Sequence, residues 1–145
     1  MGNLSEELNA NFPNQRIKAL INVKYTASWL DQIGAELLRP YKISEQQYNI
    51  LRILRGAGKA IPVHLVRDRM VQKSPNATRL MDKLCEKGLI GRHRCENDRR
   101  VVFVEITKKG LDLLEKVQIS ELHDYMNVLT EEEADLLNRL LDKLR

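Results

Sequence analysis

The sequence predicts a mainly α fold with one small β-hairpin. Apolar residues recur at helical spacing along most of the chain. Two stretches rich in β-forming residues, 89–95 and 101–107, are joined through a segment that contains the turn-favouring pair Asn97-Asp98. The chain has 145 residues, of which 43% are hydrophobic, and it shows no internal repeat or long linker. We therefore expect a single domain with a real core.

Residues 16–39 are predicted to form one long helix. Apolar residues recur every four positions from Ile17 to Leu37. A strict four-residue step drifts by about 40° at each repeat around a 3.6-residue helix, so the apolar stripe winds around the axis. Such a helix needs partners on more than one side, and in a small chain a second subunit is a natural source. Pro40 is expected to end the helix.

Two shorter helices are predicted next. Residues 44–58 can begin with a capping box, in which Ser44 is the cap and Gln47 is the reciprocal partner. The glycines at the end of this segment are expected to terminate it. A third, short helix is expected to open with Pro62 at its first position. Their predicted inward-facing residues are Tyr48, Leu51, Leu54, Val63, Val66 and Met70.

The fourth predicted helix starts at Ser74 as its N-cap, with Pro75 at the first helical position, and ends at Gly88. Helical spacing turns one apolar set inward and leaves a polar set outside. The inward residues are Ala77, Leu80, Met81 and Leu84, and the outward residues are Asn76, Thr78, Arg79, Asp82 and Lys83.

Two further helices are expected after the hairpin. Thr107 is a suitable cap for the first, which would place Leu111, Leu114 and Val117 on its inner side. The last segment begins with a capping box of Thr130 and Glu133. It continues with a leucine stripe that comprises Leu136, Leu137, Leu140, Leu141 and Leu144.

Charge is distributed unevenly along the chain. Residues 59–110 contain 13 Lys or Arg against 6 Asp or Glu, whereas residues 111–145 contain 4 against 9. A basic middle between less basic ends indicates an anionic partner for the middle alone. The simpler alternative is an uneven surface charge on an ordinary protein.

The order of three short helices followed by a hairpin predicts a winged helix-turn-helix. The N-terminal end of residues 74–83 offers backbone N–H groups and a positive helix dipole, which suit a phosphate. The outward Asn76, Thr78 and Arg79 are side chains that can reach base edges in a major groove. An ordinary solvated helix face is the alternative interpretation of the same pattern.

The predicted wing has basic residues at its tip. Arg94, Arg99 and Arg100 can enter a narrow minor groove, where negative potential is concentrated. Asp98 is the wrong charge for DNA, so we expect it to orient a neighbouring guanidinium by a charge-assisted hydrogen bond. A solvated charged turn is the alternative.

Two segments resemble signatures of the MarR/SlyA family of bacterial transcription regulators. "DRRVVFVEITKKG" looks like the wing of that family, and "TRLMDKLCEKGLIGR" looks like its recognition helix and first wing strand. The resemblance covers nearly the whole chain. It implies an obligate homodimer that binds a pseudo-palindromic double-stranded DNA operator, as a repressor that a small-molecule effector releases.

The resemblance also implies how the chain is divided. Residues 1–43 and 111–145 would supply N- and C-terminal dimerisation helices, and residues 44–110 would form the winged helix DNA-binding lobe. By motif position Arg100 is the first candidate for a minor-groove arginine, with Arg99 as an auxiliary. The recognition-helix candidates are Ser74, Pro75, Asn76, Thr78, Arg79 and Lys83, and the wing candidates are Arg94, Asp98, Arg99 and Arg100.

A small aromatic or phenolic effector is implied by the same resemblance, in a pocket between the dimerisation helices and the lobe. Tyr25, Trp29 and Tyr48 are candidates for its lining. Core or interface aromatics are the alternative, and the one that we favour for these three residues. Oxidant sensing through Cys95 or Cys85 is a further alternative, since a sensing thiol needs access and a lowered pKa.

Other classes of function have less support. His64, His93 and His123 are scattered, so we expect no metal site and no cofactor. No nucleophile–base pair or glycine-rich phosphate loop is evident, and we expect no enzyme. No apolar run is long enough to span a membrane and no secretory signal is present, which favours a cytoplasmic protein without a membrane partner. A winged-helix protein-interaction module that binds no DNA is the rival hypothesis.

Overall fold

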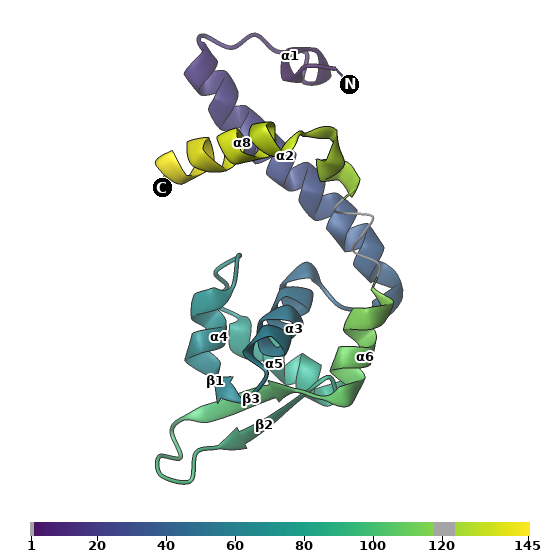
Figure 1. The fold of residues 1–145 in the computed structure, drawn as a ribbon, viewed down its shortest axis with the longest axis vertical. Coiled ribbons are helices and arrows are strands. Elements are labelled where there is room, and N and C mark those ends of the chain that lie inside the picture. Colours follow the sequence, from purple (N-terminus) through teal and green to yellow (C-terminus); the bar gives the residue numbers. More distant parts are fainter. Residues whose placement is uncertain (1, 118–123) are drawn as a thin grey trace.

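A computed structural model describes residues 2–117 and 124–145, and it confirms the predicted fold class. The fold is mainly α, with a small antiparallel sheet at one end (Figure 1). The helices are α1 (Leu4–Glu7), α2 (Gln15–Leu38), α3 (Glu45–Ala57), α4 (Val63–Arg69), α5 (Ala77–Glu86), α6 (Lys108–Lys116) and α8 (Glu131–Lys143). The strands are β1 (Ile61–Pro62), β2 (Ile90–Arg94) and β3 (Val102–Ile106), and two short 3₁₀ helices are η1 (Arg39–Tyr41) and η2 (Tyr125–Val128).

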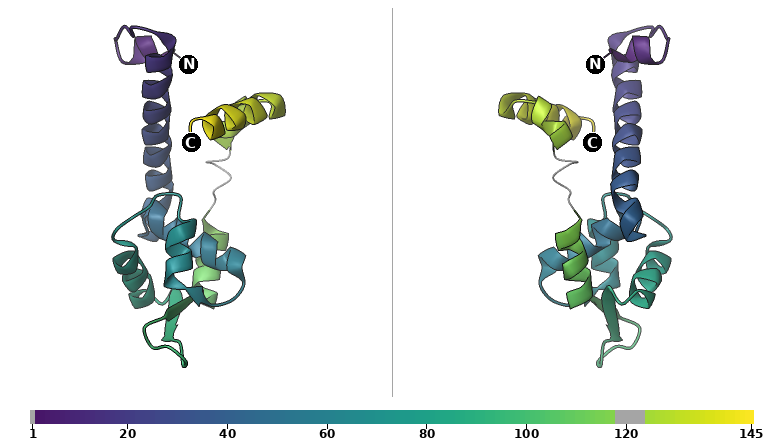
Figure 2. Two further views of the ribbon diagram at one scale, coloured as in Figure 1. Left: turned by 90° about the vertical axis from the view of Figure 1, so that its left-hand side faces the viewer. Right: turned by 90° about the vertical axis from the view of Figure 1, so that its right-hand side faces the viewer.

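The long helix α2 matches its prediction closely. Its first turn is capped by Asn14, whose side chain accepts a hydrogen bond from the Ile17 N–H at 3.0 Å. Pro40 follows in η1, and Lys42 then turns the chain with a positive φ of 55°. Figure 2 shows α2 extending away from the winged lobe as one continuous helix, with α1 at its far end. Only Gly34 and Leu38, near its C-terminal end, are buried.

The core of the lobe is built around α3. Ile50, Leu51 and Leu54 are almost completely buried, and α4, α5, α6 and β3 all pack against this helix. Tyr48, which was predicted to face inward, is only half-buried, whereas Ile50 was missing from the predicted inner face. Ile50 is buried because neighbouring elements contact α3 on several sides, so that its buried surface is wider than one stripe of residues. The capping box of Ser44 and Gln47 is present as predicted.

The sheet has three strands, one more than the predicted hairpin. β2 and β3 pair antiparallel, and β1 adds to the other edge of β3, with Ile61 opposite Val104. A two-residue strand shows no alternation in the sequence, which is why it was missed. Pro62 occupies the N-cap of α4 and ends β1, so the prediction that it opens the helix at the first position was wrong by one residue.

The start of α5 also differs from its prediction. The helix begins at Ala77, not at Pro75, and Asn76 occupies the N-cap position without a side-chain capping bond. Ser74 instead closes a turn before the helix: its hydroxyl oxygen accepts from the Asn76 N–H at 3.2 Å and its carbonyl accepts from the Ala77 N–H at 3.3 Å. The predicted division of faces is confirmed, because Ala77, Met81 and Leu84 are buried.

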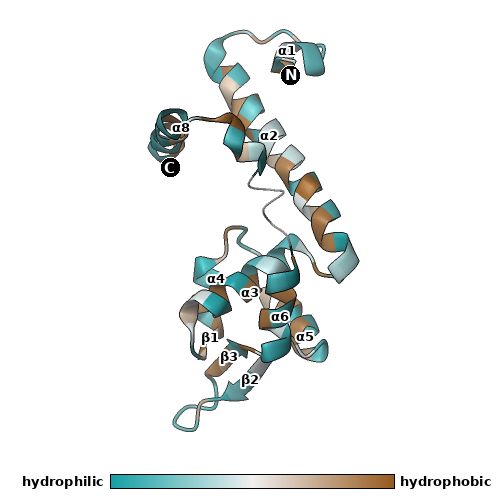
Figure 3. Ribbon diagram, turned by 45° about the vertical axis from the view of Figure 1, so that its right-hand side comes forward, coloured by the Kyte–Doolittle hydropathy of each residue, from teal (hydrophilic) through white to brown (hydrophobic). Residues whose placement is uncertain are grey.

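Of the two C-terminal helices, α6 packs into the lobe and α8 has no buried residue. Thr107 caps α6 as predicted, and Leu114 and Val117 belong to the lobe core, which thus extends to residue 117. Leu111 is 37% exposed, so its predicted inward position was wrong. The capping box of α8 is present, but none of the residues of that helix is buried. Figure 3 shows apolar stretches on α2 and α8 that lie away from the lobe.

Two glycines offer a matched test of the packing. A Cβ at Gly110 would lie 2.3 Å from the carbonyl oxygen of Leu89, whereas a Cβ at Gly56 would meet nothing within 4 Å. We expect Gly110→Ala to lower the free energy of unfolding by about 1–3 kcal/mol through overpacking. Gly56→Ala, in the last turn of α3, should raise it by roughly 0.5 kcal/mol because alanine favours the helix. Urea denaturation measures both, and equal effects of the two substitutions would contradict the packing described here.

Candidate nucleic-acid interface

α5 packs against the wing strand β2, next to the sheet (Figure 1), and its outward residues are polar. Asn76, Thr78, Arg79 and Lys83 are exposed, as is Pro75, while Ser74 is half-buried. The opposite face of α5 is held by its buried residues, so the direction of the polar face is fixed by the core. The predicted recognition residues on α5 and in the turn before it are therefore accessible, with Ser74 the least exposed.

The tip of the wing is organised by Asp98. Its Oδ1 accepts hydrogen bonds from the backbone N–H of Arg100 at 3.0 Å and from the Nε of Arg100 at 3.1 Å. Oδ2 accepts from Nη2 of the same guanidinium at 3.4 Å. Asp98 thus contacts a neighbouring guanidinium, as predicted. These hydrogen bonds from the side chain and backbone of Arg100 hold the pKa of Asp98 below its ordinary value.

Arg100 is the most exposed member of this pair. Its side chain is 92% exposed, although Asp98 contacts the Nε edge of its guanidinium. The other predicted wing arginines, Arg94 and Arg99, are also exposed. One residue pair from the wing loop, the ring of His93 stacks on that of Phe103, with centroids 5.7 Å apart. Arg94 ends β2, while Arg99 and Arg100 lie in the loop that joins the two wing strands.

A hollow of about 280 Å³ lies between α4, α5 and the wing, and we call it the basic hollow because its lining has three arginines against one carboxylate, that of Asp82. Thr78 of α5 and Arg100 of the wing contribute to its lining, and so do His64, Arg67 and Arg92. The last three were absent from the predicted interface. One sequence signal could have found two of them, because His64 and Arg67 are spaced three apart on a helix and share a face.

An ion pair ties the recognition helix to the wing. A guanidinium nitrogen of Arg92 in β2 contacts the carboxylate of Asp82 in α5. Both side chains are about half exposed, so the pair adds little to overall stability. The ion pair also changes the local charge. Asp82 was predicted only as an outward residue, and its carboxylate is partly neutralised by Arg92, so it repels an anionic partner less.

The two cysteines differ in their surroundings. Burial is the main cause that raises the pKa of the Cys85 thiol, with the Asp82 and Glu86 carboxylates adding to it and Arg92 opposing it. A raised pKa disfavours the thiolate, so the environment of Cys85 works against oxidant sensing. Cys95 is half-buried where β2 meets the wing loop, and its N–H donates to the Val101 carbonyl at 2.9 Å.

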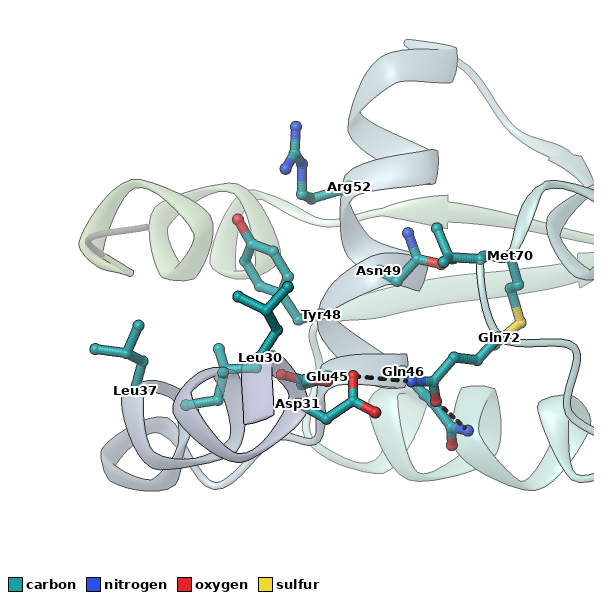
Figure 4. Close-up of a pocket in the computed structure, with 13 residues that line it drawn as sticks. Leu30, Asp31, Leu37, Glu45, Gln46, Tyr48, Asn49, Arg52, Met70 and Gln72 are labelled. Carbon is teal, nitrogen blue, oxygen red and sulfur yellow. Dashed lines mark hydrogen bonds between the residues drawn. The ribbon is translucent and has the colours of Figure 1, made fainter. Parts of the chain in front are cut away.

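The three aromatic residues proposed to line one pocket are not brought together. Tyr48 lines a cavity of about 250 Å³ between α2, α3 and residues 70–72 (Figure 4). Tyr25 and Trp29 line a different cavity, of about 530 Å³, between α1 and α2. Trp29 also packs edge-on against Tyr125, with ring centroids 5.3 Å apart. The single pocket expected from the sequence is therefore two separate cavities.

The described residues include two of the three histidines, since His123 lies outside them. Within residues 2–117 and 124–145 no group of three metal-ligating side chains comes together. Over the same ranges, no helix is both long and apolar enough to cross a membrane.

Known proteins resemble this chain in sequence and fold. A family model described as transcriptional regulator SarA/Rot matches residues 32–117. The multiple antibiotic resistance protein MarR of Salmonella typhimurium is 30% identical over 148 aligned positions, which cover 99% of each protein. A mutant MarR from E. coli, solved in complex with operator DNA, superposes with a TM-score of 0.78 at 26% identity and covers 93% of this chain and 99% of its own.

A third likeness is structural alone. An organohalide-sensing transcriptional regulator, solved in its 2,4-dichlorophenol-bound form, superposes with a TM-score of 0.80 at 20% identity. The match covers 91% of this chain and 80% of that regulator. At this identity the likeness is one of fold.

The ion pair at the wing tip predicts a measurable titration. The carboxyl of Asp98 should titrate below the ordinary aspartate range when followed by NMR, because ionised Asp98 accepts hydrogen bonds from Arg100. The stability that this contact adds is present above the unfolded pKa and is lost as the pH falls through the folded pKa. Arg100→Ala should return the pKa towards its ordinary value, whereas Arg99→Ala should leave it unchanged. An equal shift in both variants would contradict the assigned pairing.

Proposed function

We propose that this chain, which belongs to the MarR family of transcription regulators, acts as a homodimeric repressor. Members of this family are DNA-binding regulators and not enzymes. In this proposal the chain binds a pseudo-palindromic operator and is released by a small-molecule effector. The observation that carries the proposal is the surface that joins the polar face of α5, the basic hollow and the Asp98-oriented Arg100.

The recognition helix supplies the sequence-reading part of the proposal. Its exposed Arg79 can make two hydrogen bonds to guanine in a major groove, and Asn76 can do the same with adenine. Thr78 and Lys83 are exposed at the two flanks of the outward surface of α5, and the preceding turn contributes Ser74 and Pro75. The side chains that would make these contacts point outward because the buried residues of α5 fix the orientation of the helix.

The wing and the hollow supply the contacts to the backbone and the minor groove. Arg100 is proposed to enter the minor groove, with Asp98 holding its guanidinium and Arg94 and Arg99 assisting. The hollow between α5 and the wing is where the phosphate strand that separates the two grooves would run. Its basic lining residues suit that position, since phosphate contacts fix the register of a protein on DNA.

Dimerisation is proposed through the elements outside the lobe. Residues 1–43 and 111–145 are proposed as the dimerisation parts, and 44–110 as the DNA-binding lobe, with the core of the lobe continuing into α6. The apolar side chains exposed on α2 and α8 support this division, because contiguous exposed apolar surface marks an interface. They include Ile17, Leu20, Val23, Leu136, Leu137, Leu140 and Leu144.

The cavity between α2 and α3 is the proposed effector site. It lies where a dimerisation helix meets the lobe, and Tyr48 supplies an aromatic wall. Its wall also includes Met70, Val71 and Gln72, which directly precede the turn that leads into α5. An aromatic ligand seated there contacts the segment that positions the recognition helix. Tyr25 and Trp29 are assigned to α2 packing and not to this site.

Two arginine substitutions test the DNA contacts. Arg79→Ala should weaken binding to the preferred operator by about 1–3 kcal/mol and binding to random DNA by less, if it makes a bidentate base contact. Arg100→Ala should weaken binding to every duplex in similar proportion. Fluorescence anisotropy at a fixed salt concentration measures both effects, and Arg139→Ala, on the exposed surface of α8, serves as the control.

The outcome that would contradict the wing contact is an Arg100→Ala variant with unchanged affinity. If the parent protein binds no duplex, the result would instead favour a winged-helix module that recognises other proteins.

A leucine on α8 tests the assembly. Leu140 is 54% exposed in the single chain, so Leu140→Glu should leave the helix content unchanged. If α8 is part of the dimer interface, sedimentation velocity should show a dimer for the parent protein and a monomer for this variant at the same concentration. Glu132→Gln on the same helix should remain dimeric. A parent protein that sediments as a monomer would contradict the dimer proposal.

A further inference from the structure

The cavity between α2 and α3 combines apolar walls with an excess of negative charge. Its apolar lining consists of Leu30, Leu37, Leu38, Tyr48, Met70 and Val71. Its charged lining residues are Asp31, Glu45 and Arg52, two carboxylates against one guanidinium. A site of this composition favours a ligand that combines an apolar moiety with a positively charged group.

The two carboxylates lie against each other. Glu45 begins α3 and Asp31 lies on α2, and Figure 4 shows their side chains next to each other among the residues that line the cavity. The absence of a side chain at Gly34 allows this approach, because a Cβ there would lie 1.6 Å from Oε1 of Glu45. Burial is the main cause that raises the pKa of Glu45, and the nearby charge of Asp31 and a hydrogen bond between the two carboxyls raise it further.

No basic side chain neutralises this pair within the part of the chain that the structure describes. Neither Asp31 nor Glu45 takes part in any of the salt bridges there. The guanidinium of Arg52 lies over the ring of Tyr48, 6.0 Å from its centroid. Asp31 receives a hydrogen bond from the Gln72 side-chain amide at 3.4 Å, and that amide is uncharged. The hydrogen bond between the two carboxyls requires one shared proton, and a bound cation can take the place of that proton.

We propose that this cavity binds a lipophilic cation, an aromatic or alkyl amine whose ammonium group lies between Asp31 and Glu45. The apolar body lies against Tyr48 and the leucines of α2. The proposal rests on the effector site of the proposed function and specifies the charge of its ligand. It assigns an ammonium compound, in preference to a phenol or a carboxylic acid, to this chain.

The same cavity has a direct connection to the recognition helix. Gln72 bridges its two sides, since its Nε2 donates to Asp31 and its Oε1 accepts from the Gln46 side chain at 3.2 Å. The backbone N–H of Val71 donates to Oδ1 of Asn49 at 3.0 Å. An ammonium group on Asp31 competes with the Gln72 amide and so acts on the segment that ends at Ala77, where α5 begins.

Isothermal titration calorimetry on the full-length protein without DNA tests the charge of the ligand. Three probes share one phenylbutyl body and differ in the head group: phenylbutylamine, phenylbutanol and phenylpentanoate, at neutral pH. We expect the ammonium compound to bind at least about tenfold more tightly than the alcohol, a ratio that one net charge contact readily supplies. The carboxylate should bind more weakly than the alcohol, because the carboxylate pair repels it.

Isosteric variants separate the carboxylates from the fold. The double variant Asp31→Asn, Glu45→Gln should lower the affinity for phenylbutylamine to that for phenylbutanol and leave the alcohol unaffected. Glu36→Gln, which removes a charge from α2 outside the cavity, should keep the full preference. Circular dichroism of each variant shows whether the fold is retained.

Three results would overturn the proposal: equal or tighter binding of the alcohol or the carboxylate, a cation preference that survives in the double variant, or binding of none of the three probes. Because the titration contains no DNA, these results are independent of operator binding. Anisotropy on DNA with and without phenylbutylamine then tests whether the ligand acts as an effector, so that failure of the regulator proposal and failure of the ligand assignment are distinguishable.

Discussion

The burial of α3 is the constraint on which the rest of the lobe depends. Ile50, Leu51 and Leu54 make contact with elements on every side, and full burial of each such side chain contributes roughly 1.5–3 kcal/mol. Since α4, α5, α6 and β3 all pack on this one helix, their relative positions are set by a shared core. The polar face of α5 and the wing therefore face the same way as a consequence of apolar packing. The ion pair between Arg92 and Asp82 refines this arrangement and does not create it.

α3 also connects the interface to the cavity on its other side. Its first residue, Glu45, lines the cavity, while its middle residues hold α5 and β3. Residues 70–72 form a second connection, because they line the cavity and lead into the turn before α5. A ligand that favours one position of this segment changes the equilibrium between arrangements of the recognition helix. The α2–α3 junction is thus the place where the proposed effector would act on the recognition helix.

Local signals in the sequence were sufficient for most of the helices, for the caps at Ser44, Thr107 and Thr130, and for the wing. The capping boxes at Ser44 and Thr130 each use side chains within four residues, so they are visible without knowledge of the fold. The contact between Asp98 and Arg100 is equally local. The two-residue strand β1 has too few residues for a pattern, and the late start of α5 depends on a turn that Ser74 closes. These features needed the three-dimensional structure.

The functional groups that the sequence missed are those assembled from distant segments. His64, Arg67 and Arg92 meet in one hollow only after the lobe has folded, and Asp31 meets Glu45 because α2 and α3 cross at Gly34. The aromatic residues Tyr25, Trp29 and Tyr48 were grouped by type, but α2 is long enough to place them in separate cavities. Residue type indicated the chemistry of these positions, and tertiary packing decided which of them share a site.

Specific DNA binding by the surface formed by α5 and the wing is the central requirement of the proposed function. The most direct measurement is the affinity of the purified protein for the DNA upstream of its own gene, across a salt series and beside a scrambled duplex. The account predicts tighter binding to the upstream DNA, with the logarithm of the affinity falling steeply as the logarithm of the salt concentration rises. An absence of binding to either duplex at low salt would contradict it.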